Sequence, residues 1–414
     1  MKPDINSRKI KYFDYMLLVI VLFLLAVGLL MLYSTSSYTA SLKYNDGGYY
    51  LKKQAISTAV GLVAMIITAL FPYKLYRKFS APIYVLSVMS LFLVLTKLGY
   101  SANNATRWIH IAGLSIQPAE IVKIGLIVGM AAIFTKMTEK ELRGWKPILF
   151  MIVIAGLPAG VLWKVTDNAS SAIIVLGIAY AMLVVSTKKS IKPYILLAVG
   201  MVGATLYVVA IAKGWSQNLS FRGERILAWL DLEAYADTKG FQTIQSLYGI
   251  GSGGIWGKGI GKSMQKLGFL PEAQNDMIFS VVCEELGAIG GIAIMFMYLM
   301  LLWRIRDAAK LTKDPFGALL VSGVFAHIAI QVVLNIAVAT SVIPNTGVSL
   351  PFISYGGSSA IFLLAEIGIV MNVGRNAFKN VQTIETDDAG AGKTNSNELN
   401  DTTGGNSTDE NAGR

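Results

Sequence analysis

The sequence predicts an all-α polytopic membrane protein that crosses a lipid bilayer about ten times. Three observations predict this fold class. Hydrophobic residues make up 54% of the 414 residues and charged residues only 15%, whereas soluble domains carry about 25% charged residues. The apolar residues form runs of about 20, the length that an α-helix needs to cross the hydrocarbon. These runs are too long for barrel strands, so helices must satisfy their backbone groups in lipid.

Connectors rich in Lys, Arg, Gly or Pro separate the apolar runs, and we place the expected helix boundaries at these connectors. The expected transmembrane helices are Phe13–Leu32, Ala55–Phe71, Ala81–Leu98, Glu120–Phe134, Pro147–Trp163, Ser170–Val185, Tyr194–Ala212, Met277–Trp303, Ala318–Val338 and Ala360–Val373.

Lys and Arg predict the orientation of these helices. Basic residues are frequent before the first helix and in alternate connectors such as 136–146 and 304–313, whereas the connector 340–357 has none. Cytoplasmic loops carry the excess of Lys and Arg, so both termini are expected in the cytoplasm. The net charge of +11 therefore reflects membrane topology, and no nucleic-acid partner is expected.

Cysteine and histidine are scarce. Cys283 is the one cysteine, and His110 and His327 are the two histidines. A disulfide framework within the chain and a metal site built from Cys or His are therefore excluded.

Two segments fall outside the expected helices. The stretch 213–273, between the seventh and eighth helices, is rich in Arg, Lys and Gly, and we expect it to form a large extracytoplasmic loop. Within it, 219–235 mixes apolar and charged residues in a pattern typical of a helix lying in the membrane interface. The tail 383–414 lacks apolar clusters. We therefore expect a transmembrane domain, 1–382, and a disordered cytoplasmic tail, 383–414.

Three ionisable residues lie near the start of the fourth helix. Glu120 and Lys123 are three residues apart, so they share a helix face and can pair. Ionisable groups are costly in lipid, which leaves a structural ion pair and a substrate contact as alternatives. Arg107 precedes Trp108, and the pair is either an interfacial anchor or a phosphate ligand that uses the planar fork of the guanidinium.

The glycine-rich segment 249–263 matches two nucleotide motifs only in part. Gly249–Gly254 has G-x-G-x-x-G spacing, but no strand precedes it. Gly261-Lys262-Ser263 resembles the end of a P-loop, but Trp256 stands where that motif needs glycine. The segment predicts a flexible or tightly turned loop whose N–H groups could line an anion site.

Asp276 directly precedes the eighth helix, where it either caps the helix or presents a carboxylate at the membrane rim. The connector 344–359 holds two prolines, three glycines and several hydroxyl groups at membrane depth. This composition predicts a re-entrant or cavity-lining backbone.

Taken in order, these motifs resemble the SEDS family (shape, elongation, division and sporulation). The resemblance covers the chain from the first helix to Val373. The amino-acid sequence of the outer loop is most similar to that of the division and sporulation members. The motifs that carry it are Arg107-Trp108-Ile109, Gln117-Pro118-x-Glu120 with Lys123, Gln265-Lys266, Leu270-Pro271-Glu272-Ala273 followed by Asp276, and Leu350–Ser359.

The resemblance implies a peptidoglycan glycosyltransferase that polymerises lipid II at the outer face of the bacterial cytoplasmic membrane, in septal division. It also implies a partner, a class B penicillin-binding transpeptidase, and contact with the division machinery. It places the catalytic carboxylate on Asp276. The expected substrate-binding residues are Arg107, Glu120, Lys123, Lys266, Glu272 and Ser354.

The chemistry agrees with this assignment. The sugar hydroxyl needs a base, and the departing diphosphate needs positive charge, from Arg107, Lys123 and Lys266 or from a divalent cation such as Mg²⁺ or Mn²⁺. No metal site made by the protein alone is expected. The turn Val165-Thr166-Asp167-Asn168 departs from the family pattern. A lipid flippase, a structural scaffold and an elongation polymerase remain as alternatives.

Overall fold

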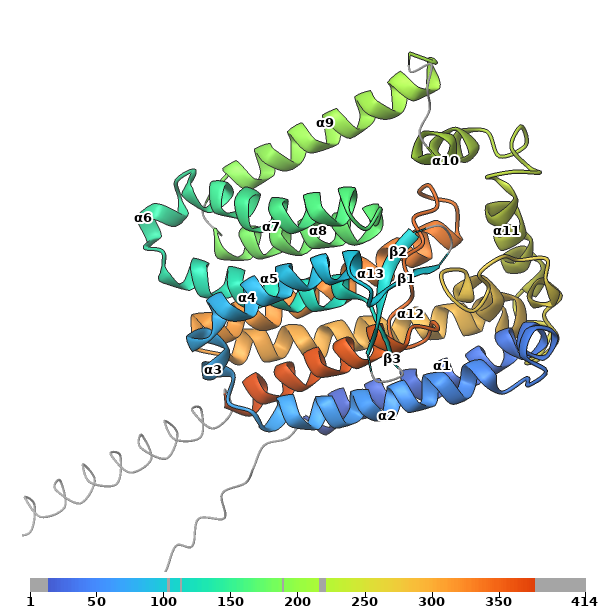
Figure 1. Ribbon diagram of the computed structural model, residues 1–414, viewed down its shortest axis with the longest axis horizontal. Helices are drawn as coiled ribbons and strands as arrows, with labels where there is room; N and C mark the ends of the chain where they lie inside the picture. The colour runs from blue at the N-terminus through green and yellow to red at the C-terminus, as the bar shows by residue number, and fades with distance from the viewer. Residues whose placement is uncertain (1–13, 103–104, 112–113, 188–189, 216–220, 377–414) are drawn as a thin grey trace, which may run out of the picture.

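The computed structural model describes residues 14–102, 105–111, 114–187, 190–215 and 221–376. Long helices lie roughly side by side and form one bundle (Figure 1). The all-α membrane fold is therefore confirmed. The predicted disordered tail, 383–414, and the basic N-terminal segment lie outside the described residues.

In the described part of the chain, nine helices are long and apolar enough to cross a membrane. The third predicted span corresponds to a shorter apolar helix, Ser80–Leu95. The long helices are α1 Tyr15–Tyr44, α2 Tyr49–Leu70, α5 Pro118–Lys136, α7 Lys146–Lys164, α8 Ala169–Ser186, α9 Lys192–Ala212, α12 Ile278–Leu311, α13 Pro315–Ala339 and the last helix, Gly357–Asn376.

Short elements connect the long helices. They are α3 Tyr73–Lys78, α4 Ser80–Ser90 with the 3-10 helix η1 Leu91–Leu95, α6 Glu139–Leu142, α10 Phe221–Leu230, α11 Phe241–Gly253, the 3-10 helix η2 Gln265–Leu267, and strands β1 Gly99–Ala102, β2 Ala105–Ile111 and β3 Leu114–Ile116.

Side chains that the sequence places before the apolar runs start several helices. Asp14 accepts a hydrogen bond from the Leu17 amide of α1, and Asn168 accepts one from the Ser171 amide of α8. Each cap satisfies one of the amides that a helix leaves without a partner in its first turn.

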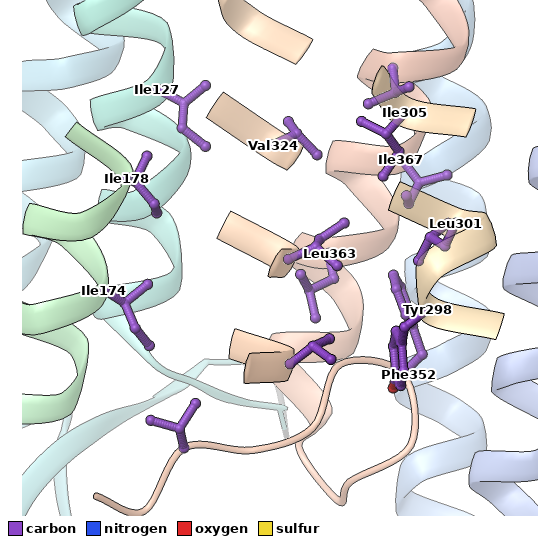
Figure 2. Close-up of a cluster of buried hydrophobic side chains, with 14 of the residues drawn as sticks. Ile127, Ile174, Ile178, Tyr298, Leu301, Ile305, Val324, Phe352, Leu363 and Ile367 are labelled. Atoms are coloured by element: carbon purple, nitrogen blue, oxygen red, sulfur yellow. The ribbon is translucent and has the colours of Figure 1, made fainter. Parts of the chain in front are cut away.

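The centre of the bundle is a continuous apolar core. Figure 2 shows side chains of α5, α8, α12, α13 and the last helix meeting there, together with Phe352 from the connector before the last helix. Ile127, Ile178 and Leu363 are among them, each no more than 1% exposed. In contrast, α9 leans away from the other helices, and only Pro193 and Ile211 on it are buried (Figure 1).

The connector between η1 and α5 forms an antiparallel sheet in the order β1-β2-β3. The sequence analysis missed it. A local signal exists in the sequence, since the turn-like pairs Asn103-Asn104 and Ala112-Gly113 flank a run rich in β-branched and aromatic residues, Thr106–Ile111. The sheet places Arg107 on its middle strand.

Helix α12 breaks at Gly287, where φ is 71° and ψ is −173°. The broken backbone is paired with the loop that follows α11. The amides of Lys258 and Gly259 donate to the carbonyls of Glu284 and Glu285, both at 2.9 Å. On the other side of the break, the amide of Ala288 donates to the carbonyl of Gly254 at 2.9 Å. The loop thus satisfies groups that a broken helix would otherwise leave exposed to lipid.

Glycine is required for this close approach. A Cβ on Gly257 would lie 2.3 Å from the carbonyl oxygen of Glu285, and one on Gly287 would lie 2.3 Å from that of Ile255. The prediction of a turned loop for the glycine-rich segment is correct from Gly254 onward. It is wrong for Gly249–Gly253, because these residues complete α11 and lie against α12.

We expect Gly287→Ala to lower the melting temperature of the purified protein. Its backbone conformation is open almost only to glycine and costs other residues about 1–3 kcal/mol, before the clash with Ile255. The buried thiol of Cys283 allows the measurement, because a thiol-reactive dye labels it only on unfolding. Gly203→Ala, in an open position on α9, is the control and should melt no earlier than wild type. Equal melting of Gly287→Ala and wild type would contradict this role for the break.

Candidate active site

Asp276 lies where the outer loop enters α12, and its side chain is only 8% exposed. Met277, which has no capping side chain, occupies the N-cap of α12. The alternative that Asp276 caps this helix is therefore wrong.

One side chain of α13 positions the Asp276 segment. The amide of Asn335 donates to the backbone carbonyl of Asp276 at 2.7 Å and to that of Val348 at 2.8 Å. The backbone amide of Tyr355 also donates to the carbonyl of Gln274 at 2.9 Å. The connector before the last helix is therefore fastened beside Asp276, and its predicted role in lining a cavity stays a prediction. The sequence analysis did not identify Asn335 as a site residue.

The carboxylate of Asp276 faces Gly347, and a Cβ placed on that glycine would lie 3.7 Å from its Oδ2. Its Oδ1 is buried and accepts no hydrogen bond from the described parts of the chain. Burial, and after it the charge of Glu272, raise the pKa of Asp276 to about 7, whereas Arg225 acts in the opposite direction. A carboxylate that titrates near neutral pH is suited to general base catalysis.

Glu272 and Arg225 surround this carboxylate. Glu272 has a positive φ of 55° and accepts a hydrogen bond from the side chain of Asn275. Arg225, on α10, donates to the carbonyl of Asn345 at 3.2 Å. The predicted helix within 219–235 exists, but the analysis of the sequence did not single out Arg225. The charge pattern of that amphipathic segment was the feature of the sequence that could have identified Arg225.

Arg107 holds the turn at Thr166 and Asp167 through hydrogen bonds to its backbone. Its guanidinium donates to the carbonyls of Thr166, at 3.2 Å, and Asp167, at 2.7 Å. The hydroxyl of Ser170, in the next turn of the chain, donates to the carbonyl of Thr346. The segment that departs from the family pattern is thus a structured turn, held by Arg107 on one side and touching the connector beside Asp276 on the other.

Lys123 and Glu120 form a buried ion pair, with 2.7 Å between Lys123 Nζ and Glu120 Oε1. The predicted pairing is confirmed. The pair lies near a second buried contact that the sequence analysis missed, a hydrogen bond in which His327 Nδ1 is 2.8 Å from Glu366. All four side chains are at most 5% exposed. Lys123 therefore has an internal counter-charge, and contact with substrate would require this cluster to open.

Lys266 also points into the protein. Its ammonium group lies 2.9 Å from Glu285 and 2.9 Å from the hydroxyl of Ser34. The adjacent Glu284 accepts hydrogen bonds from the amide of Met264, at 3.0 Å, and from the ammonium group of Lys258, at 2.7 Å. The anion site predicted for the glycine-rich loop therefore exists in part, and the carboxylate of Glu284 fills it.

Ser354 is 5% exposed, and its hydroxyl accepts a hydrogen bond from the amide of Leu350 at 2.7 Å. It closes a turn in the connector beside Asp276. Its predicted contact with substrate stays a prediction, as do those of Arg107, Glu120, Lys123, Lys266 and Glu272.

Within the described residues, no group of three or more His, Cys, Asp or Glu side chains is arranged to hold a metal ion. Asp276 and Glu272 offer two carboxylates near one another. Oxygen ligands suit Mg²⁺, which is usually held by one or two carboxylates together with substrate phosphates. The donor set therefore fits a cation that the substrate helps to bind.

Known proteins resemble the chain over most of its length. The model of the cell cycle protein family FtsW/RodA/SpoVE matches residues 15–379. A probable peptidoglycan glycosyltransferase FtsW of Geobacter metallireducens is 40% identical over 89% of this chain and 96% of its own. Stage V sporulation protein E of Bacillus subtilis is 35% identical over 87% of this chain and 97% of its own.

A solved structure shares the fold. One chain of a peptidoglycan synthase complex that coordinates polymerization and crosslinking aligns with a TM-score of 0.71 and 25% identity, over 88% of this chain and 98% of that chain. These similarities agree with the membrane fold and with a peptidoglycan glycosyltransferase activity. The chain belongs to the FtsW/RodA/SpoVE family of cell cycle proteins.

Proposed function

We propose that the protein polymerises lipid II into glycan strands and that Asp276 is the general base. The observation that carries this proposal is the buried carboxylate of Asp276, with a pKa of about 7 and with an Oδ1 that accepts no hydrogen bond from the described residues. It lies at the end of a membrane-spanning helix, where a substrate on a lipid anchor presents its diphosphate and sugars.

In the proposed step, the 4-hydroxyl oxygen of one sugar attacks the anomeric carbon of a second, lipid-linked sugar. The bond between that carbon and the diphosphate breaks, and its electron pair leaves with the undecaprenyl diphosphate. The hydroxyl proton moves to Asp276, which then releases it to water. Diphosphate is a good leaving group, so a second carboxyl acid is not required.

Positive charge must stabilise the departing diphosphate. Lys123 and Lys266 are held in buried ion pairs, so in this conformation they are poorly placed to provide it. Arg225 acts electrostatically on Asp276 and comes from the outer loop. We therefore add Arg225 to Arg107 as a candidate phosphate-binding residue, and a divalent cation shared with substrate would serve the same purpose.

The partner we propose is a class B penicillin-binding transpeptidase, with septal division as the setting. The match to a complex that couples polymerization with crosslinking supports the partner, and the similarity to FtsW and to a sporulation protein supports division over elongation. A lipid flippase would use the same lipid, and the buried cluster of Glu120, Lys123, His327 and Glu366 is the feature that favours it. Purified protein that makes glycan polymer in detergent distinguishes the two activities.

Asp276→Asn should reduce polymer formation from lipid II by about 10²–10⁴-fold, the usual contribution of a general base. Asparagine keeps the size of the side chain, and the Asn335 bond to the backbone carbonyl is unaffected. The matched control is Asp237→Asn, an exposed acid of the same outer loop, which should leave the rate unchanged. Binding of lipid II, measured separately, should persist in both variants. Near-normal polymer synthesis by Asp276→Asn would remove this residue from the mechanism.

The orientation predicted from Lys and Arg places the outer loop outside the cell and both termini inside. Single cysteines introduced by Asp237→Cys and Lys140→Cys test this orientation. Asp237 lies in the outer loop and Lys140 in a basic connector. The native Cys283 is buried and does not react with the reagent. A membrane-impermeant thiol reagent added to intact cells should label position 237 and leave position 140 unlabelled. The reverse pattern would invert the topology and place Asp276 on the wrong side of the membrane for lipid II polymerisation.

A further inference from the structure

The loop that fills the break in α12 exposes large apolar side chains. Ile255 is 64% exposed, Trp256 80%, Ile260 55% and Met264 54%. Transfer of large apolar side chains out of water is favourable, so water is a poor environment for four of them on one loop. The loop is nevertheless held in place, through backbone bonds to α12 and the contacts of Glu284. It therefore presents a preformed apolar surface.

This surface continues the lipid-facing side of α12. Beyond the break, the exposed residues of α12 recur every three or four positions, as one face of a helix requires. At the start of this part of α12, the amide of Ile289 donates to the carbonyl of Ile255 at 3.3 Å, so the loop residues extend the same face. The exposed residues of that face are Ile289, Ile292, Phe296, Leu299 and Trp303.

The length of this face matches a bilayer. From Gly287 to Trp303 the helix rises about 24 Å, and the hydrocarbon is about 30 Å thick. Trp303 is followed by Arg304, as expected at one membrane interface. The missing length of about one helical turn beyond Gly287 is where Ile255 and Trp256 lie.

The charge of the loop fits a lipid surface as well. The segment 241–271 contains Lys258, Lys262 and Lys266 and no Asp or Glu. Lys258 and Lys266 are paired with Glu284 and Glu285 of α12, whereas the exposed Lys262 can face the headgroups. Apolar and aromatic side chains beside lysines are typical of segments that insert into the interface of a membrane with anionic lipids.

We propose that the loop 254–264 is a membrane anchor, which inserts Ile255, Trp256 and Ile260 into the lipid leaflet on the Asp276 side of the bilayer. Since the loop is bonded to Glu284 and Glu285, in the short helix that begins beside Asp276, the anchor sets the height of this carboxylate relative to the lipid headgroups. This consequence rests on the proposed function, whereas the anchor itself does not.

The test measures the depth of position 256. Trp256→Cys is labelled with an environment-sensitive fluorophore, with Cys283 left buried, and the protein is placed in phosphatidylethanolamine–phosphatidylglycerol vesicles that contain lipids spin-labelled near the headgroup or deep in the acyl chain. Phe296→Cys is the control within lipid, and Asp237→Cys is the control outside the membrane.

At position 256 we expect shallow spin labels to quench the fluorophore several-fold more than at position 237, and more than deep ones do. At position 296 the deep labels should quench more. Quenching at 256 no greater than at 237 would overturn the anchor, whether or not the protein polymerises lipid II. A label at 256 that aqueous iodide reaches in vesicles, and that is shielded only when a purified transpeptidase is added, would also overturn it and assign the surface to a protein.

Discussion

The break in α12 at Gly287 is the constraint on which the rest of the site depends. A polar backbone at membrane depth must find hydrogen-bond partners within the protein, and here the glycine-rich loop provides them. The requirement explains why the outer loop needs glycine at 257, where its backbone meets that of Glu285. It also explains the fixed start of α12. The short helical segment before the break has Asp276 at its beginning, and its end is paired with the loop.

Buried charges then lock this arrangement. Lys266 with Glu285 and Lys258 with Glu284 join the loop to α12, and removing one partner of such a pair strands the other charge, a change that typically costs several kcal/mol. Asp276 differs from these carboxylates, because its Oδ1 accepts no hydrogen bond from the described residues and neutral Gly347 lies beside its Oδ2. An oxygen that has no hydrogen-bond partner in the described residues can accept a proton from a substrate.

The sequence was sufficient to predict the helical membrane fold, the Glu120–Lys123 pair and the position of Asp276 at the start of a helix, since runs of apolar residues and local spacing specify these features. Contacts between distant segments could not be predicted from local patterns. Asn335 binds Asp276 across 59 positions and His327 meets Glu366 across 39, and no periodicity encodes either contact. The glycine motif predicted a turned loop, but its role in filling the break in α12 depends on the backbone of that helix, which lies outside the motif.

The central claim is that burial keeps the pKa of the Asp276 carboxyl near 7, so that this group can accept a proton during the reaction. The pH dependence of glycan polymerisation by purified wild-type protein, under saturating lipid II, tests it most directly. Because the base acts as a carboxylate and its pKa is raised from 3.8 to about 7, the rate should rise with pH and reach half its maximum near pH 7. A rate that is already maximal well below neutral pH, as a carboxyl with the ordinary pKa of 3.8 would give, would contradict the account.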